Sequence, residues 1–349
     1  MRFGCPCFLL SKSLLTRFAD DPDLPDATRD ACRRTLAQDT DWRAIRIARQ
    51  AATRLTPRPG FLGAHTMRNA PTIEVYDCKG SDVLPGSPIA DPATSEDATA
   101  RRVFEQTSNA ARFLAECFGR NSVDDYGLTL VSSIHLADKY VNAYWDGTQM
   151  TYGDADGELM LDFTLAGEIV AHELAHGVTQ YTAGFEFIYG EPGALNESMS
   201  DAFALMYRHW NAGLDVESGD WVIGADIIGP AAKARGYTCI RDLSDPSGEH
   251  CAAPQAIHVS GFLDGGDPHI NSGIPNRAFY LAARALGGRV WERTGPIWYA
   301  AMQDEATKAD STFREFAKRT RSAARRIYGE GPELDAVVQA WKTVGVLKR

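Results

Sequence analysis

The chain has 349 residues, of which 44% are hydrophobic and 23% are charged. That length allows two domains with their own cores, and the composition is ordinary for a globular protein. The net charge of −10 argues against nucleic acid as the main partner, and no apolar run reaches the ~20 residues of a membrane span.

The beginning of the chain is basic, whereas the rest is acidic. Residues 1–70 hold twelve Lys/Arg and seven Asp/Glu, and the remaining 24 basic and 39 acidic residues carry a net charge of −15. Either the two parts attract each other, or the difference is compositional drift. Lys12 and Arg17 interrupt a short apolar stretch, so we expect an amphipathic helix there rather than a secretory signal.

The following elements are predicted from hydrophobic periodicity and turn residues. A second helical segment runs from Asp26 to about Arg49, and the Pro- and Gly-containing residues 53–71 indicate a linker. Strands are expected at 72–76, 128–134 and 141–147, and a helix is expected at 98–118. Residues 154–158 resemble the start of a calcium loop, but they predict only a turn because the twelfth position is Leu165.

A His-Glu-Leu-Ala-His motif lies near the middle of the chain. On a helix, His172 and His176 stand one turn apart on one face, where two imidazoles can occupy two corners of a tetrahedral zinc site. Glu173 lies off that face, so it can reach a water beside the metal without binding the ion. The motif alone would also fit a surface helix that carries two histidines.

Two carboxylates follow on a second predicted helix. Twenty residues separate His176 from Glu197, which begins an apolar-periodic run and can supply a third zinc ligand while one position stays open. Asp201 lies one turn later and can accept the second N–H of a ligating histidine. The alternative interpretation is a capping carboxylate followed by a solvated aspartate.

The C-terminal half is predicted to be mostly helical. A loop-rich stretch covers residues 224–273, and helices are expected at 275–286, 295–303, 311–328 and 333–344. We therefore predict an α+β protein with a β-rich N-terminal lobe, an α-helical C-terminal lobe and the histidine helix between them. The seven scattered cysteines form no disulfide framework, and Cys239 and Cys251, which flank one polar loop, could be paired or unpaired.

Several ordered motifs make the chain similar to the thermolysin family of zinc metalloendopeptidases, and within it to the protealysin-like branch. The similarity covers residues 72–349 and, more loosely, the N-terminal segment before them, which we call the leader. The motifs are NAYWDG (142–147), YGDADG (152–157), VAHELAHGVTQYTAG (170–184), GALNESMSD (193–201), LSDP (243–246) and HINSGIPNRAFY (269–280).

The resemblance implies a two-lobed zinc endopeptidase and a role for each motif residue. His172, His176 and Glu197 would hold one zinc ion, Asp201 would orient a histidine, and Glu173 would be the general base that acts on the attacking water.

The resemblance also implies residues that bind the oxyanion and the peptide substrate. His269, oriented by Asp264, would stabilise the developing oxyanion together with Tyr189. Asn142 and the Ala143 backbone would hold the substrate as an added strand, and Arg241 would bind a substrate carbonyl. We expect cleavage before Leu, Phe or Ile because the matching S1′ positions are apolar, namely Met160, Phe163, Ile169 and Ile240.

The sequence departs from the family at the positions of a double calcium site. Glu168 and Asp220 keep two of the expected carboxylates, but Arg208, Val222 and Ala225 replace three others. A fixed positive charge among calcium ligands opposes the ion, so we predict that Arg208 bridges the two carboxylates and that the double site is lost. A single calcium ion elsewhere is left open.

The leader resembles the short propeptide of the protealysin-like branch. Cys5–Leu10 falls where that branch has a Pro-Pro-aromatic-Leu motif, although Cys7 replaces a proline. The resemblance implies a zymogen whose residues 1–60 assist folding and block the site until the 51–71 linker is cut. We further hypothesise that Cys5 or Cys7 meets the zinc as a thiolate. The expected division is 1–60 propeptide and linker, 61–182 N-terminal lobe and 183–349 C-terminal lobe.

Two other functions were weighed against an endopeptidase. A catalytically inactive binding protein fits poorly because every mapped chemical position is filled. A zinc aminopeptidase would need an acidic anchor for the substrate amine, which we do not find before the histidine motif. We expect a monomer whose partners are protein or peptide substrates and its own propeptide. The resemblance implies secretion, and a cytoplasmic location is the alternative.

Overall fold

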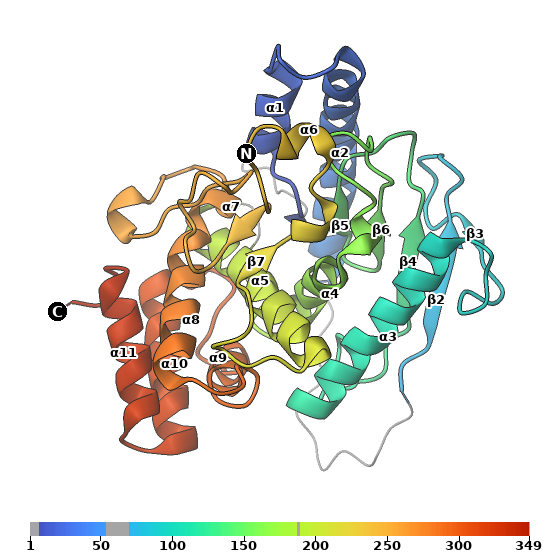
Figure 1. The fold of residues 1–349 in the computed structure, drawn as a ribbon. Helices are drawn as coiled ribbons and strands as arrows, with labels where there is room; N and C mark the ends of the chain where they lie inside the picture. The colour runs from blue at the N-terminus through green and yellow to red at the C-terminus, as the bar shows by residue number, and fades with distance from the viewer. Residues whose placement is uncertain (1–6, 54–69, 187–188, 349) are drawn as a thin grey trace.

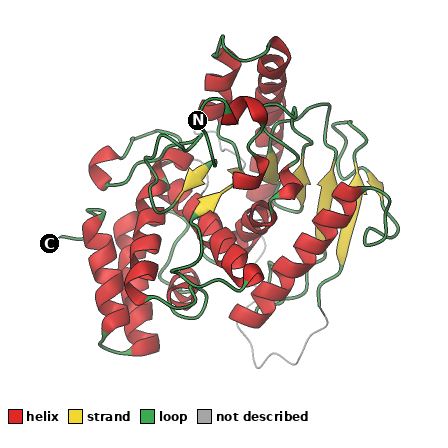
Figure 2. Ribbon diagram, in the orientation of Figure 1, coloured by secondary structure: helices red, strands yellow, loops and turns green. Residues whose placement is uncertain are grey.

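The computed structural model describes residues 7–53, 70–186 and 189–348, and its main sheet lies to one side of the C-terminal helices (Figure 1, Figure 2). Six strands form one sheet in the order β1-β5-β6-β4-β2-β3, and β4 pairs in parallel with β2 and β6. The strands are β1 (Cys7–Phe8), β2 (Ile73–Asp77), β3 (Ser87–Pro88), β4 (Leu130–Ile134), β5 (Ala143–Trp145) and β6 (Met150–Tyr152).

Helix α4 (Gly167–Tyr181) lies between the sheet and the C-terminal helices, in the centre of Figure 1. It contacts β5, β6 and α3 (Ala98–Phe118) on one side and α5 (Gly190–Ala212) on the other. Gly177 permits this close packing, because a Cβ there would lie only 3.2 Å from Cζ2 of Trp145. The predicted α+β architecture, with the histidine helix between two lobes, is confirmed.

Helices form the C-terminal lobe, and α8 and α9 pack against α5. No helix among the described residues has both the length and the apolar character needed to cross a lipid bilayer. The long helices of this lobe are α8 (Gly273–Leu286), α9 (Thr294–Met302), α10 (Phe313–Tyr328) and α11 (Pro332–Thr343). The shorter elements of the chain are η1 (Phe163–Leu165), β7 (Val222–Ile223), η2 (Ala225–Ile227), α6 (Pro230–Lys233), β8 (Arg241–Asp242), η3 (Val259–Gly261) and α7 (Pro268–Asn271).

The leader is packed onto the rest of the protein. Strand β1 pairs antiparallel with β5 at the edge of the main sheet, and it is followed by α1 (Lys12–Asp20) and α2 (Asp26–Thr53). The expected amphipathic helix therefore begins later than the apolar stretch, because residues 7–8 are extended against β5. Ser11 caps α1, and the buried side chains of Leu14 and Phe18 join the main hydrophobic core.

The largest difference from the predicted elements is the start of α5. This helix begins at Gly190, seven residues before Glu197, so Glu197 lies inside the helix and not at its start. The sequence Gly190–Asn196 contains two glycines and Pro192, which lower helix propensity. Pro192 is tolerated because it lies in the first turn, where its missing N–H has no helical partner to lose.

His135 joins the start of α3 to the turn at Asp154. Its Nδ1 lies 2.7 Å from Asp154 Oδ1 and its Nε2 lies 2.9 Å from Oδ2 of Asp97, which also caps α3. The hydrogen bonds to Asp154 and Asp97 raise the pKa of His135 to about 9. Burial acts in the opposite direction, but its effect is smaller than that of the two bonds together. His135 also has a positive φ of 55°, a conformation that asparagine tolerates well.

We predict that His135→Asn reduces the pH dependence of stability. The folded-state pKa lies above the unfolded value, so the charged bonds stabilise the fold below about pH 6.5 and are lost as the pH rises through about 9. Calorimetry from pH 6.5 to 10 should show the wild type losing on the order of 1 kcal/mol more than the variant. Parallel melting profiles for the two proteins would contradict this role.

Candidate metal centre and active site

Two histidines of α4 and one glutamate of α5 converge in the buried interface between these helices. His172 Nε2 and His176 Nε2 are 3.1 Å apart, and Glu197 Oε2 lies 3.6 Å and 3.8 Å from them. Nitrogen and oxygen ligands at about 2.0 Å from one tetrahedral zinc lie about 3.3 Å apart. The three side chains therefore fit the ligand set of a zinc ion with one open position.

The outer nitrogen of each histidine is held by α5. His172 Nδ1 lies 3.0 Å from Asp201 Oδ1, the contact expected from the spacing of Asp201 and Glu197. His176 Nδ1 lies 2.8 Å from Asn196 Oδ1 and 2.9 Å from Ser200 Oγ. Asn196 and Ser200 were not identified from the sequence, although they have the same i, i+4 spacing as Glu197 and Asp201. These contacts direct both Nε2 atoms toward the metal position.

Asp201 is the most heavily bonded carboxylate of the site. Arg241 donates to it from Nε at 2.9 Å and from Nη2 at 2.7 Å, and Asn276 Nδ2 donates at 2.9 Å. Burial would raise the pKa of Asp201, but Arg241 and His172 hold it well below its usual range. Asp201 therefore stays ionised and keeps accepting from the His172 imidazole.

The site is rich in buried negative charge. Three acidic residues are at most 2% exposed, namely Glu173, Glu197 and Asp201. The buried Arg241 guanidinium is the permanent positive charge beside them. Burial opposes ionisation of Glu197, yet the charges of His269 and His176 lower its pKa to about 2. A divalent cation at the ligand set would balance this excess of carboxylates.

The histidine pKa values reflect the same surroundings. Burial lowers the pKa of His172, but hydrogen bonds to Asp201 and Glu197 outweigh burial and raise it to about 9. In the absence of an ion, this imidazole therefore has a high affinity for a proton. The carboxylates that hold the proton would hold a metal cation in its place, with release of the proton.

His269 lies on the other side of Glu197, and its orienting residue is not the one expected. Its Nε2 is 3.3 Å from Glu197 Oε2, and its Nδ1 is 2.8 Å from Oδ1 of Asp267. The prediction of Asp264 as this partner is wrong, because Asp264 is exposed in the preceding loop. Asp267 is better placed since it caps the short helix α7, in which His269 is the second residue.

Tyr189 is not assembled with the other residues. It caps the N-terminus of α5 with its side chain 47% exposed, and no hydrogen bond of the described residues joins it to His269 or Glu197.

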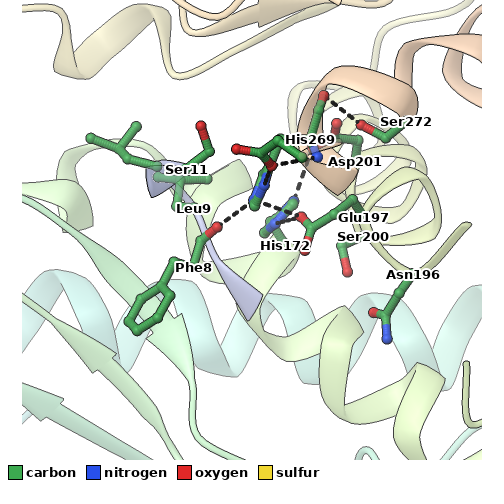
Figure 3. A network of polar contacts seen from close by, with 12 residues as sticks. Phe8, Leu9, Ser11, His172, Asn196, Glu197, Ser200, Asp201, His269 and Ser272 are labelled. Carbon is green, nitrogen blue, oxygen red and sulfur yellow. Dashed lines mark hydrogen bonds and ion pairs between the residues drawn. The ribbon is translucent and has the colours of Figure 1, made fainter. Parts of the chain in front are cut away.

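The leader occupies the open side of the metal ligands. The Phe8 carbonyl oxygen lies 2.6 Å from His269 Nε2, as Figure 3 shows, and the Leu9 carbonyl accepts from Arg241 Nη1 at 3.1 Å. Ser13 Oγ donates to Asp267 Oδ2 at 2.7 Å, which adds a contact to the residue that orients His269. The leader thus bonds to the groups expected to act on a substrate.

The same segment pairs with the sheet edge as an added strand. Leu9 N donates to the Ala143 carbonyl at 3.0 Å, and the Asn142 side chain exchanges two hydrogen bonds with the backbone of Leu10, at 2.9 Å and 3.0 Å. Asn142 and Ala143 therefore bind an extended backbone, the geometry expected of them for a peptide. Leu9 is fully buried in the hydrophobic cluster that contains the four expected pocket residues, Met160, Phe163, Ile169 and Ile240.

Leader and body are joined by few opposite charges. Among the described residues, a salt bridge between the leader and the rest of the protein joins Asp21 to Arg235 at 3.0 Å. Its acidic partner lies on the leader, although the leader is basic overall. Strand pairing and apolar burial thus hold the leader here. Cys5 and the side chain of Cys7 lie outside the described residues, so the thiolate hypothesis stays a hypothesis.

Arg208 lies beside Glu168 and Asp220, the two carboxylates that it was expected to bridge. It lies 3.2 Å from Glu168, 2.9 Å from Asp220 and 3.4 Å from Asp226. Burial raises the pKa of Glu168, and the Arg208 charge opposes that rise. The Arg208 guanidinium thereby partly neutralises the negative charge of these three carboxylates.

The chain is similar to known protein families, sequences and solved structures. The family model of the thermolysin metallopeptidase catalytic domain matches residues 63–180, and that of the thermolysin metallopeptidase alpha-helical domain matches residues 183–346. An extracellular metalloprotease of Pectobacterium carotovorum is 36% identical over 283 residues, covering 78% of this chain and 80% of that protein. Protease PrtS of Photorhabdus sp. is 35% identical over 285 residues, covering 78% and 76%.

Two further relatives extend the comparison. Thermolysin of Alicyclobacillus acidocaldarius is 34% identical over 286 residues, and the match spans only 51% of that protein. The solved structure of the precursor of protealysin, a metalloproteinase from Serratia proteamaculans, superimposes with a TM-score of 0.82 at 32% identity and covers 97% of this chain and 99% of that one. Two family models that together span most of the chain, and relatives above 30% identity, establish that this chain belongs to the thermolysin family of zinc metallopeptidases.

Proposed function

We propose that this protein is a zinc-dependent endopeptidase made as a zymogen, in which residues 8–10 occupy the substrate site. The observation that carries the proposal is the position of the Phe8 carbonyl, 2.6 Å from His269 and next to the His172, His176 and Glu197 ligand set. The likeness to a solved protealysin precursor over 97% of the chain supports the zymogen.

The proposed chemistry divides between the metal position and Glu173. His172, His176 and Glu197 would hold zinc, which when bound polarises a carbonyl and acidifies water. Glu173 is fully buried beside His172 on α4, where its carboxylate takes a proton from the attacking water and delivers it to the leaving amine. Burial in a dry site strengthens both proton transfers because no bulk water competes.

His269 is proposed to stabilise the oxyanion. Glu197 and Asp267 raise the pKa of His269 against the effect of burial, which favours an imidazolium that donates from both nitrogens. Nδ1 donates to Asp267, and Nε2 donates to the carbonyl oxygen that gains negative charge, the position now taken by the Phe8 oxygen. Tyr189 would add a second donor after its exposed side chain closes on the site.

The leader defines the register of a bound peptide. With the Phe8 carbonyl at His269 and the Leu9 carbonyl at Arg241, the Phe8–Leu9 bond lies where a scissile bond would lie. Leu9 then corresponds to the residue on the carboxyl side of the cut. This register supports an apolar S1′ pocket formed by Met160, Phe163, Ile169 and Ile240.

Maturation and location follow from the same proposal. We propose that 1–60 is the propeptide and linker, 61–182 the N-terminal catalytic lobe and 183–349 the C-terminal lobe, with cleavage in the 51–71 linker. We also propose a monomer that acts outside the cell; the location is supported by a relative 36% identical that is named an extracellular metalloprotease. The Arg208 cluster supports the loss of the double calcium site.

Glu173→Gln tests the proposed proton transfer. This isosteric change should lower kcat for casein by about 10³-fold or more, because the acid–base group is removed, while the metal content stays that of the wild type. Mass spectrometry should show the wild type without its leader and the variant with it. A variant that digests casein at the wild-type rate, or a wild type insensitive to chelators, would disprove the mechanism.

Cleavage of a peptide library tests the register. We expect Leu, Phe or Ile after the cut, since burying such a side chain contributes roughly 2 kcal/mol, equivalent to a preference of about thirtyfold over a small polar residue. Acetylated and free-amine versions of one peptide should be cut equally, as for an endopeptidase. Preference for a charged residue, or a requirement for the free amine, would refute this specificity.

The calcium proposal is tested by heat inactivation with and without millimolar calcium. The half-life of the wild type should change little, because Arg208 already neutralises Glu168 and Asp220. Arg208→Asp should become less stable and should regain stability with calcium, whereas Arg208→Met should lose stability without any rescue. Strong calcium protection of the wild type would reject the idea.

A further inference from the structure

A second group of metal-binding side chains lies outside the site described above. Cys239, His250 and Cys251 each offer one ligand atom, and these atoms all lie within 4.8 Å of one another. Both cysteines are buried, whereas His250 is partly exposed. The catalytic proposal uses none of these three residues, so their convergence calls for a separate explanation.

Two separations within this group are close to those of a tetrahedral site. Cys239 Sγ and Cys251 Sγ are 3.8 Å apart, and Cys251 Sγ lies 3.7 Å from His250 Nε2. Around a zinc ion with sulfur at about 2.3 Å and nitrogen at about 2.0 Å, the corresponding separations are about 3.8 Å and about 3.5 Å. We propose that Cys239, His250 and Cys251 bind a second, structural transition-metal ion of the zinc type.

Asp242 is placed to complete the site. Its Oδ2 lies 3.1 Å from His250 Nε2, close to the oxygen–nitrogen separation of about 3.3 Å around zinc. Its other oxygen accepts from the Ser244 backbone N–H at 2.8 Å, which fixes the carboxylate. A pair of cysteines that merely formed a disulfide would require neither the imidazole nor this carboxylate, so the four-residue arrangement favours a metal.

The backbone holds the ligands together without the ion. Cys239 and Cys251 form a parallel bridge, in which Ala252 N donates to the Cys239 carbonyl at 2.9 Å. Binding a metal as thiolates would release the thiol protons to solvent. Such prearrangement reduces the ordering cost of binding.

The location of the group connects it to the proposed active site. Cys239 and Asp242 flank Ile240 and Arg241, which are the apolar pocket residue and the arginine that bonds to Asp201 and the Leu9 carbonyl. An ion held by Cys239, Cys251 and Asp242 would fasten strand β8 at both ends. The ion would therefore hold the Arg241 guanidinium in place without contacting the substrate, so its role is positional.

The full-length Glu173→Gln protein, which avoids self-digestion, allows the metal content to be counted by mass spectrometry. We expect two zinc ions per chain in this protein and one after Cys239→Ser and Cys251→Ser are added. The matched control, Cys32→Ser with Cys117→Ser, should keep two, because these cysteines lie elsewhere. His250→Ala changes a partly exposed residue and should weaken binding of the second ion at least tenfold in a chelator competition.

A second background separates this proposal from the catalytic one. A His172→Ala, His176→Ala protein should still bind one ion, and its cobalt form should show thiolate-to-cobalt charge-transfer absorption that Cys239→Ser removes. Thiol titration should find Cys239 and Cys251 reactive only after the metal is removed. The proposal is overturned if native protein carries a Cys239–Cys251 disulfide, or if the cysteine and histidine variants leave the metal content unchanged.

Discussion

The buried ion pair between Asp201 and Arg241 is the interaction on which the site depends. It joins α5 to β8, and the same carboxylate accepts from His172 of α4 and from Asn276 of α8. Four separate segments are therefore positioned by one fully buried charge. Removing a partner would leave an uncompensated charge in the interior, which typically costs 3–5 kcal/mol. This cost explains how side chains from distant parts of the chain keep their mutual geometry.

The leader uses ordinary β-pairing to reach this site. Strand β1 extends the main sheet beyond β5, so the carbonyls of Phe8 and the following Leu9 lie beside His269 and Arg241. An extended backbone has the same hydrogen-bonding pattern whether it belongs to an inhibitor or to a substrate. Inhibition and recognition are thus two consequences of a single exposed sheet edge.

Charge substitution recurs away from the active site. Arg208 places a fixed positive charge among the carboxylates of Glu168, Asp220 and Asp226. Near β8, two thiols, an imidazole and a carboxylate are gathered close to Arg241, whose guanidinium is already paired with Asp201. Local ligand chemistry, rather than overall charge, therefore determines where this protein can use a metal.

The sequence by itself predicted the His172, His176 and Glu197 group and the approximate limits of most long helices, because i, i+4 spacing on a helix sets which side chains share a face. Helix α3 was predicted at its observed limits, and His172, His176 and Asp201 met as expected. Only the tertiary structure identified Asp267 in place of Asp264, the Asn196 contact and the grouping of Cys239 with His250. Loop conformation and long-range packing decide such contacts, and no local periodicity encodes them.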